Sequence, residues 1–219
     1  MAAAAVPITP AALARLVADR ALALLDAGSR CPRVGIDGAV PSDTGGLADQ
    51  VCALLSRDGC AVARVRAGDF LRPRSVRLEH GAQDPDSGYE RWFDHHALRR
   101  EVLDTLGPDG DLTWLPSLWD PLRDRATRAA RRTALLGSIL VLDGPFLLRW
   151  ETADAVDVGV LLQASHAAMA RRLDAADVAR TVGAWSRYVE ESRPQERADL
   201  VVRVEHPDRP ALGRRPQGS

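Results

Sequence analysis

Lysine and asparagine are both absent from this chain of 219 residues, and all 29 of its basic side chains are arginine. Without lysine the protein cannot form a Schiff base, and it lacks the ammonium group with which a phosphate-binding loop holds a triphosphate. Acidic residues balance the arginines to a net charge of -1, which predicts neither a nucleic-acid partner nor a membrane partner. Apolar runs of ~18 residues, which a membrane-spanning helix needs, are also missing.

Cysteine and histidine are scarce, and their spacing excludes the common metal centres. The three cysteines, Cys31, Cys52 and Cys60, form no CxxC pair and suit a reducing compartment, so we predict a cytoplasmic protein. His95 and His96 lie at a predicted helix start, where we interpret them as surface or capping residues. Since no HxxxH spacing accompanies them, the sequence predicts no metal site of this kind.

Short apolar strands alternate with amphipathic helical segments, which predicts an α/β fold with a mostly parallel sheet. The predicted strands are 33–37, 60–67, 137–144, 156–162 and a last strand in ADLVVRV, with helices at 46–58, 164–174 and 176–191. The chain divides into an N-terminal helix within 1–30, a main domain at 31–206 and a disordered tail at 207–219. The turn-rich segment 71–93 is expected to be an ordered surface loop.

The segment VGIDGAVPSDTGGLADQV (34–51) has the strand, glycine and helix order of a phosphate-binding loop, but not its chemistry. A G-x-x-x-x-G-K-[ST] loop starting at Gly38 would place Gly, Lys and Ser/Thr where this chain has Asp43, Thr44 and Gly45. The Asp43 carboxylate would repel a triphosphate, and it could accept hydrogen bonds from the free N–H groups of its own helix.

Acidic residues follow successive predicted strands: Asp37, Asp69 and Asp143, with Asp120 after an extended segment. Each of them alone is typical of a turn or a helix cap. Ligands of parallel sheets bind at the carboxyl ends of the strands, however. Several acids at successive strand ends therefore indicate a ligand-binding cleft.

Six segments in order resemble the uridine kinase-like nucleoside kinases, over about residues 33–210. They are VGIDG…LADQV, RVRAGDFLRPRSVR, SGYERWFDHHALRREVLDTLGPDGD, LWD, ILVLDGPFLL and RPQERADLVVRVEHPDRP. The resemblance implies a three-layer P-loop NTPase-like fold with a small helical lid. It also implies that Asp69 is the general base toward a substrate hydroxyl and that Asp143 holds magnesium through water.

The same resemblance implies a small-molecule substrate, with ATP and Mg²⁺ as cofactors. The segments that would line the nucleoside side of the pocket contain Phe70, Arg72, Arg74, Tyr89 and Asp120. Arg172 matches the arginine-bearing lid, in which Ala176 replaces a second arginine. The substrate side of the family pattern is thus retained, whereas the phosphate loop departs from it.

Three functional hypotheses remain open at this stage. The chain could be a nucleoside kinase in which Arg66, Arg72 or Arg172 supplies the missing positive charge. It could be a repurposed enzyme that uses Asp69 as an acid/base without a triphosphate. It could also be a non-catalytic pseudokinase that regulates a partner. The N-terminal helix could pack on the sheet or join two copies as a homo-oligomer.

Overall fold

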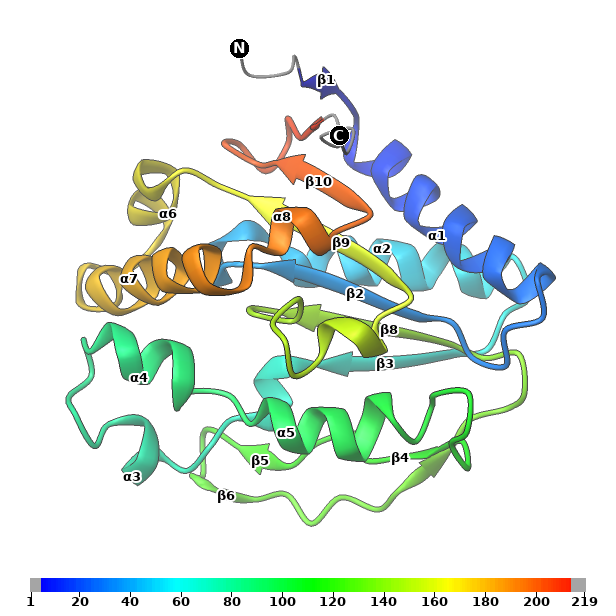
Figure 1. Cartoon of the computed structure of the whole chain (residues 1–219), viewed down its shortest axis with the longest axis horizontal. Coiled ribbons are helices and arrows are strands. Elements are labelled where there is room, and N and C mark those ends of the chain that lie inside the picture. Colours follow the sequence, from blue (N-terminus) through cyan, green and yellow to red (C-terminus); the bar gives the residue numbers. More distant parts are fainter. Residues whose placement is uncertain (1–4, 214–219) are drawn as a thin grey trace.

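The computed structural model describes residues 5–213, which form one mixed sheet with helices on both faces (Figure 1). Within this part of the chain the sheet has seven strands in the order β1-β11-β10-β9-β2-β8-β3. The strands are β1 Val6–Pro7, β2 Arg33–Gly38, β3 Val62–Arg66, β8 Ile139–Gly144, β9 Val158–Gln163, β10 Leu200–Arg203 and β11 Ala211–Leu212. Strands β10, β9, β2, β8 and β3 run parallel, and only β1 and β11 pair antiparallel. The predicted α/β class is confirmed.

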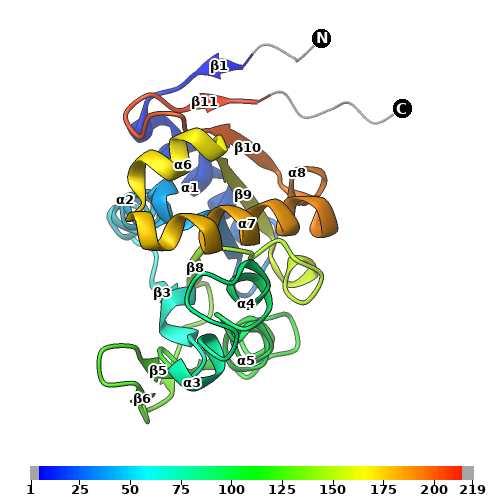
Figure 2. The same cartoon turned by 90° about the vertical axis from the view of Figure 1, so that its left-hand side faces the viewer.

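Helices cover the sheet in two layers (Figure 2). On one face, α1 (Pro10–Asp26) packs against α2 (Thr44–Arg57) over the sheet. The other face carries α5 (His95–Leu98), a π-helical turn (Arg99–Leu103) and α7 (Ala175–Ser192). The short helices α3, α4, α6 and α8 span Arg74–Arg77, Pro85–Glu90, His166–Arg172 and Pro194–Arg197. Strand alternation produces the two layers, since Ile139 and Val141 face α2 while Leu140 and Leu142 face the opposite layer.

Two small ribbons lie at the end of the molecule away from β1 and β11 (Figures 1 and 2). They pair β4 (Thr113–Trp114) with β7 (Arg132–Thr133) and β5 (Trp119–Asp120) with β6 (Arg125–Ala126). The arginines of β6 and β7 are exposed.

The N-terminal helix adopts one of the arrangements left open by the sequence, and the C-terminal segment differs from its prediction. Helix α1 is capped by Thr9 and belongs to the α2 layer, so it packs on the sheet. The predicted disordered tail is wrong over 207–213, because β11 pairs with β1 and β10. The rest of that predicted tail, 214–219, lies outside the described residues.

The segment 71–93 is folded into α3 and α4 and is not a simple surface loop. The Asp84 side chain accepts a hydrogen bond from Ser87 N at 2.7 Å, and Pro85 starts the helix. Cap and proline together favour a helix start. Ser87 and Tyr89 are buried as a result.

No helix within residues 5–213 is long and apolar enough to cross a membrane.

Candidate active site

The carboxyl ends of β2, β8 and β3 meet at one edge of the sheet. In the register, Asp37 pairs with Gly144 and Arg66 pairs with Asp143. Three segments therefore continue from neighbouring points: the loop after Gly38, the turn after Gly144, and the 3-10 helix Ala67–Phe70, which carries Asp69. This edge is where the sequence predicts a ligand cleft.

The loop after β2 is closed on itself by Asp43. This residue has a left-handed backbone (φ 56°, ψ 42°), and its carboxylate accepts a hydrogen bond from Gly46 N at 3.1 Å. A Cβ at Gly46 would lie 2.6 Å from Asp43 Oδ1, so the carboxylate rests directly on the glycine. The predicted self-capping is present. The helix start therefore holds an internal anion where a phosphate-binding loop holds phosphate.

Asp143 is buried, with 6% of its surface exposed, and both its oxygens contact protein groups. Oδ2 accepts a hydrogen bond from Thr44 Oγ1 at 2.9 Å. Oδ1 lies 2.6 Å from Arg64 Nη1 in an ion pair. The geometry is that of a charge contact, because Arg64 Nη1 directs its hydrogen bond at the Val65 carbonyl oxygen.

Sequence reasoning missed Arg64, although a signal was present. Arg64 stands in the middle of a strand whose neighbours Ala63 and Val65 are buried. Alternation puts Arg64 on the α2 face, as it does Asp143, which follows Val141 by two residues. A half-buried arginine at such a position needs an acidic partner, and Asp143 on the neighbouring strand provides one.

Asp69 is half-buried, and its carboxylate has no hydrogen bond or ion pair with any of residues 5–213. Its backbone carbonyl accepts a hydrogen bond from Leu118 N at 2.8 Å, which ties the turn to the segment before β5. Burial raises the pKa of Asp69, while Arg66 and Arg64 oppose that rise. The backbone of Asp69 is therefore held in place, and its carboxylate is available to a ligand.

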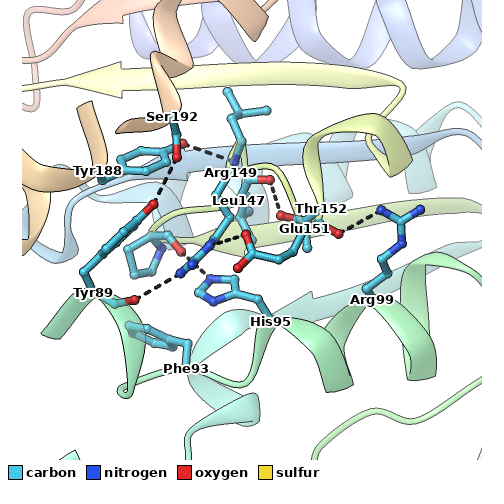
Figure 3. A network of polar contacts seen from close by, with 12 residues as sticks. Tyr89, Phe93, His95, Arg99, Leu147, Arg149, Glu151, Thr152, Tyr188 and Ser192 are labelled. Atoms are coloured by element: carbon cyan, nitrogen blue, oxygen red, sulfur yellow. Dashed lines mark hydrogen bonds and ion pairs between the residues drawn. The ribbon is translucent and has the colours of Figure 1, made fainter. Parts of the chain in front are cut away.

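Phe70 and Tyr89 belong to the core and do not line an accessible pocket. Phe70 is fully buried and Tyr89 is 2% exposed. The Tyr89 hydroxyl is 3.1 Å from Ser192 Oγ, and its carbonyl accepts a hydrogen bond from Arg149 Nη1 at 3.1 Å (Figure 3). Arg149 also pairs with Glu151 at 2.5 Å. Tyr89 thus joins α4 to α7 and to the turn after β8.

The other predicted substrate residues mostly bind neighbouring protein groups. Arg72 Nε donates to the Phe93 carbonyl at 3.4 Å. Asp120 accepts hydrogen bonds within its own turn, including one from Arg123 Nη1 at 2.9 Å, and these lower its pKa. The Arg74 side chain is exposed. Arg72, Arg74 and Asp120 each keep part of their side chains exposed, although Asp120 is already bonded within its own turn.

Arg172, predicted as a lid residue that binds substrate or replaces the lysine charge, binds backbone carbonyl groups, one of them in the loop before Asp43. Its guanidinium donates to the carbonyl oxygens of Pro41 (3.2 Å), Val204 (2.9 Å) and Glu205 (2.5 Å). It therefore fixes the loop before Asp43 to the end of β10. Its donors are directed at carbonyl groups.

Two predicted surface or cleft residues are buried. Alternation turns Asp37 toward α7, where it accepts hydrogen bonds from Phe146 N (2.9 Å), Leu148 N (3.0 Å) and the Tyr188 hydroxyl. Burial raises the pKa of Asp37 to about 6. His95, expected at the surface, is 3% exposed, and burial lowers its pKa to about 3. Both side chains are structural.

A narrow cleft with a volume of about 30 Å³, enough for one or two water molecules, lies between the loop after β2, α4 and α7. Its walls are mainly apolar and aromatic, and sequence reasoning did not single out these residues. They include Val40, Trp92, Phe93, Phe146, Arg180 and Trp185. The Arg180 guanidinium stacks 3.9 Å from the Trp92 ring in its wall, and the cleft as it stands is far smaller than a small-molecule pocket.

The residues present do not fit a magnesium-bound triphosphate. Asp43 places negative charge at the helix start, Thr44 carries none, and Gly45 has no oxygen to offer a metal. Within the described part of the chain, no group of three or more His, Cys, Asp or Glu side chains could hold a metal ion.

Comparison with known proteins identifies the fold. No protein-family model matches the chain, and no curated protein matches it. Among solved structures, it is similar to a possible uridine kinase from Bacillus stearothermophilus, with 22% identity and a TM-score of 0.67 over 85% of this chain and 97% of that one. A proposed fructose transport system kinase from Silicibacter sp. TM1040 gives 24% identity and a TM-score of 0.63, over 84% and 94% of the two chains.

These likenesses define the class of fold: a uridine kinase-like P-loop kinase fold of three layers. The predicted fold class and the resemblance to this branch are confirmed. Fold alone assigns no activity, so function must be argued from the site.

Proposed function

We propose that this protein binds a small hydroxyl-bearing molecule at the carboxyl edge of its sheet and does not transfer phosphate from ATP. The observation that carries the proposal is the hydrogen bond from Gly46 N to the Asp43 carboxylate. The missing lysine, the missing Ser/Thr oxygen and the Gly46 amide that Asp43 occupies together remove several charge-assisted contacts of about 1.5–3 kcal/mol each. An added carboxylate repels the same ligand, so affinity for a triphosphate falls by orders of magnitude.

Asp69 supports a substrate role for this edge. Its carboxylate is free of protein partners among residues 5–213, and its pKa is raised by burial. A raised pKa brings a carboxylate closer to the range in which it exchanges protons with a substrate hydroxyl. The reaction would be one that needs no triphosphate, with Asp69 as the acid/base.

A non-catalytic binding role is the second candidate. The burial of Phe70 and Tyr89 favours it, because two residues predicted on the nucleoside side are occupied in the core. Ligand binding without turnover would distinguish this role from the first.

Calorimetric titration with uridine and with fructose, the molecules named for the two similar structures, tests the proposal. We expect at least one to bind without Mg²⁺ or ATP, and Asp69→Asn to weaken that binding by roughly tenfold or more. Asp26→Asn, an exposed acid at the far end of α1, is the matched control. Saturable binding of Mg-ATP together with phosphate transfer to either compound would contradict the proposal.

A further inference from the structure

The buried Asp143 carboxylate is the group that the family resemblance assigns to magnesium. In this chain both of its oxygens already contact protein groups, although Oδ1 accepts no hydrogen bond from the described residues and is held by charge alone. Thr44 Oγ1 donates to Oδ2 at 2.9 Å, and Arg64 Nη1 lies 2.6 Å from Oδ1. One oxygen therefore faces a hydroxyl donor and the other faces a permanent positive charge.

We propose that the Arg64 guanidinium is the resident cation of Asp143 and that this carboxylate binds no divalent ion. The inference deepens the proposed function, on which it rests for the absence of a triphosphate. It assigns Arg64 as a positioning residue that maintains Asp143 as a carboxylate without a metal.

Arg64 is fixed where it lies. Its Nε donates to Asp49 Oδ1 at 3.0 Å, and its Nη1 donates to the Val65 carbonyl at 2.6 Å. Only 20% of its side chain is exposed. An arginine held by two acids and a strand carbonyl does not swing away to admit another cation at low cost.

Electrostatics and ligand count oppose a metal in addition to Arg64. A divalent ion on Oδ1 would lie within a few ångströms of the guanidinium, and burial strengthens the repulsion between them. Mg²⁺ also requires near-octahedral oxygen coordination, which here would have to form without a carboxylate cluster among the described residues. A side chain at position 45 would begin 3.6 Å from Asp143 Oδ2, but glycine there offers no hydroxyl to a metal.

The charge left at the site follows from this pairing. Asp143 is paired with Arg64, so Asp69 is the acid among Asp37, Asp69 and Asp143 whose carboxylate has neither a hydrogen bond nor an ion pair within residues 5–213. Asp143, Arg64 and Thr44 would therefore hold one another in place, and Asp143 would not contact the reacting atoms.

Mn²⁺, a spectroscopic substitute for Mg²⁺, provides the test. Electron paramagnetic resonance of free Mn²⁺ is recorded with wild type, Asp143→Asn, Arg64→Gln, Arg64→Lys and the double variant Arg64→Gln/Asp143→Asn, with folding checked by circular dichroism. We expect wild type, Asp143→Asn and Arg64→Lys to bind Mn²⁺ equally poorly. We expect Arg64→Gln to bind it roughly tenfold or more tightly and the double variant to lose that gain.

Three results would overturn the inference. Wild type could bind Mn²⁺ more tightly than Asp143→Asn, which would place a metal on Asp143 with Arg64 present. A folded Arg64→Gln could fail to gain Mn²⁺ binding, or could gain it without needing Asp143. Should Arg64→Gln not fold, the comparison of wild type with Asp143→Asn still decides between equal and unequal binding. Failure of uridine or fructose to bind would count against the proposed function and would leave these Mn²⁺ results unchanged.

Discussion

The Asp43 carboxylate accepts a hydrogen bond from the Gly46 amide across 3.1 Å, at the first turn of α2. In a phosphate-binding loop the same turn presents its N–H groups to phosphate. Here a side chain of the loop satisfies one of them and brings its own negative charge. The helix start is thus stabilised from within, and a triphosphate would have to displace the cap.

Asp43→Ala is expected to lower the free energy of unfolding by about 1–2 kcal/mol. Loss of an N-cap costs about 0.5–2 kcal/mol, and alanine tolerates the left-handed backbone of residue 43 poorly. Asp43→Asn is the control, because asparagine keeps both the acceptor and the tolerance for positive φ. Urea denaturation of the three proteins measures the effect. Equal stability of Asp43→Ala and wild type would show that the cap contributes nothing.

Asp37 should make wild type less stable as the pH rises from about 4 to about 6. Its pKa is about 6 in the folded protein against 3.8 for the ordinary side chain, so folding favours the protonated form and that advantage is lost as the proton leaves. The free energy of unfolding that is lost in this way is at most about 3 kcal/mol.

The Asp37→Asn variant isolates this effect because it removes the titrating group. In the place of Oδ2, the amide NH2 can donate to the Tyr188 oxygen. Leu148 N, which loses Oδ2 as an acceptor, already lies 3.2 Å from that same oxygen. Stability curves for wild type and variant should diverge between pH 4 and pH 6, as measured by chemical denaturation at each pH. Parallel curves over that range would mean that Asp37 does not titrate there.

Arg172→Ala should loosen the loop before Asp43. Its guanidinium bonds to Pro41, Val204 and Glu205 carbonyls, so truncation frees the loop from the end of β10. Hydrogen exchange of residues 39–43 should become faster, while exchange in the core strand β2 stays slow. Arg171→Ala, an exposed neighbour, is the matched control. Identical exchange of this loop in both variants would mean that Arg172 does not hold it.

The fold was predictable because the hydrophobic periodicity of its strands and helices is visible in the sequence. The continuous apolar run at β8 and the glycine-bounded α2 match their predicted positions within a few residues. The helix α4 was missed because its cap, Asp84 followed by Pro85, lies in a segment whose polar composition resembles a loop.

The site was less predictable, because side-chain direction depends on register and packing. Asp37, Asp69 and Asp143 all follow strands, but only Asp69 remains free of protein partners among residues 5–213. Alternation turns Asp37 into the α7 layer and brings Asp143 to Arg64. Neither direction can be read from the order of residues until the neighbouring strands are known.

Titration with Mg-ATP tests the central claim most directly, with wild type and a restored loop (Asp43→Gly, Thr44→Lys and Gly45→Ser together) measured in one calorimetric series. We predict that wild type shows no saturable binding up to about 1 mM, while the restored loop gains binding of at least roughly tenfold. Asp43→Gly alone removes the carboxylate but returns no ammonium group, and we expect it to resemble wild type. Micromolar binding of Mg-ATP to the wild-type protein would contradict the account.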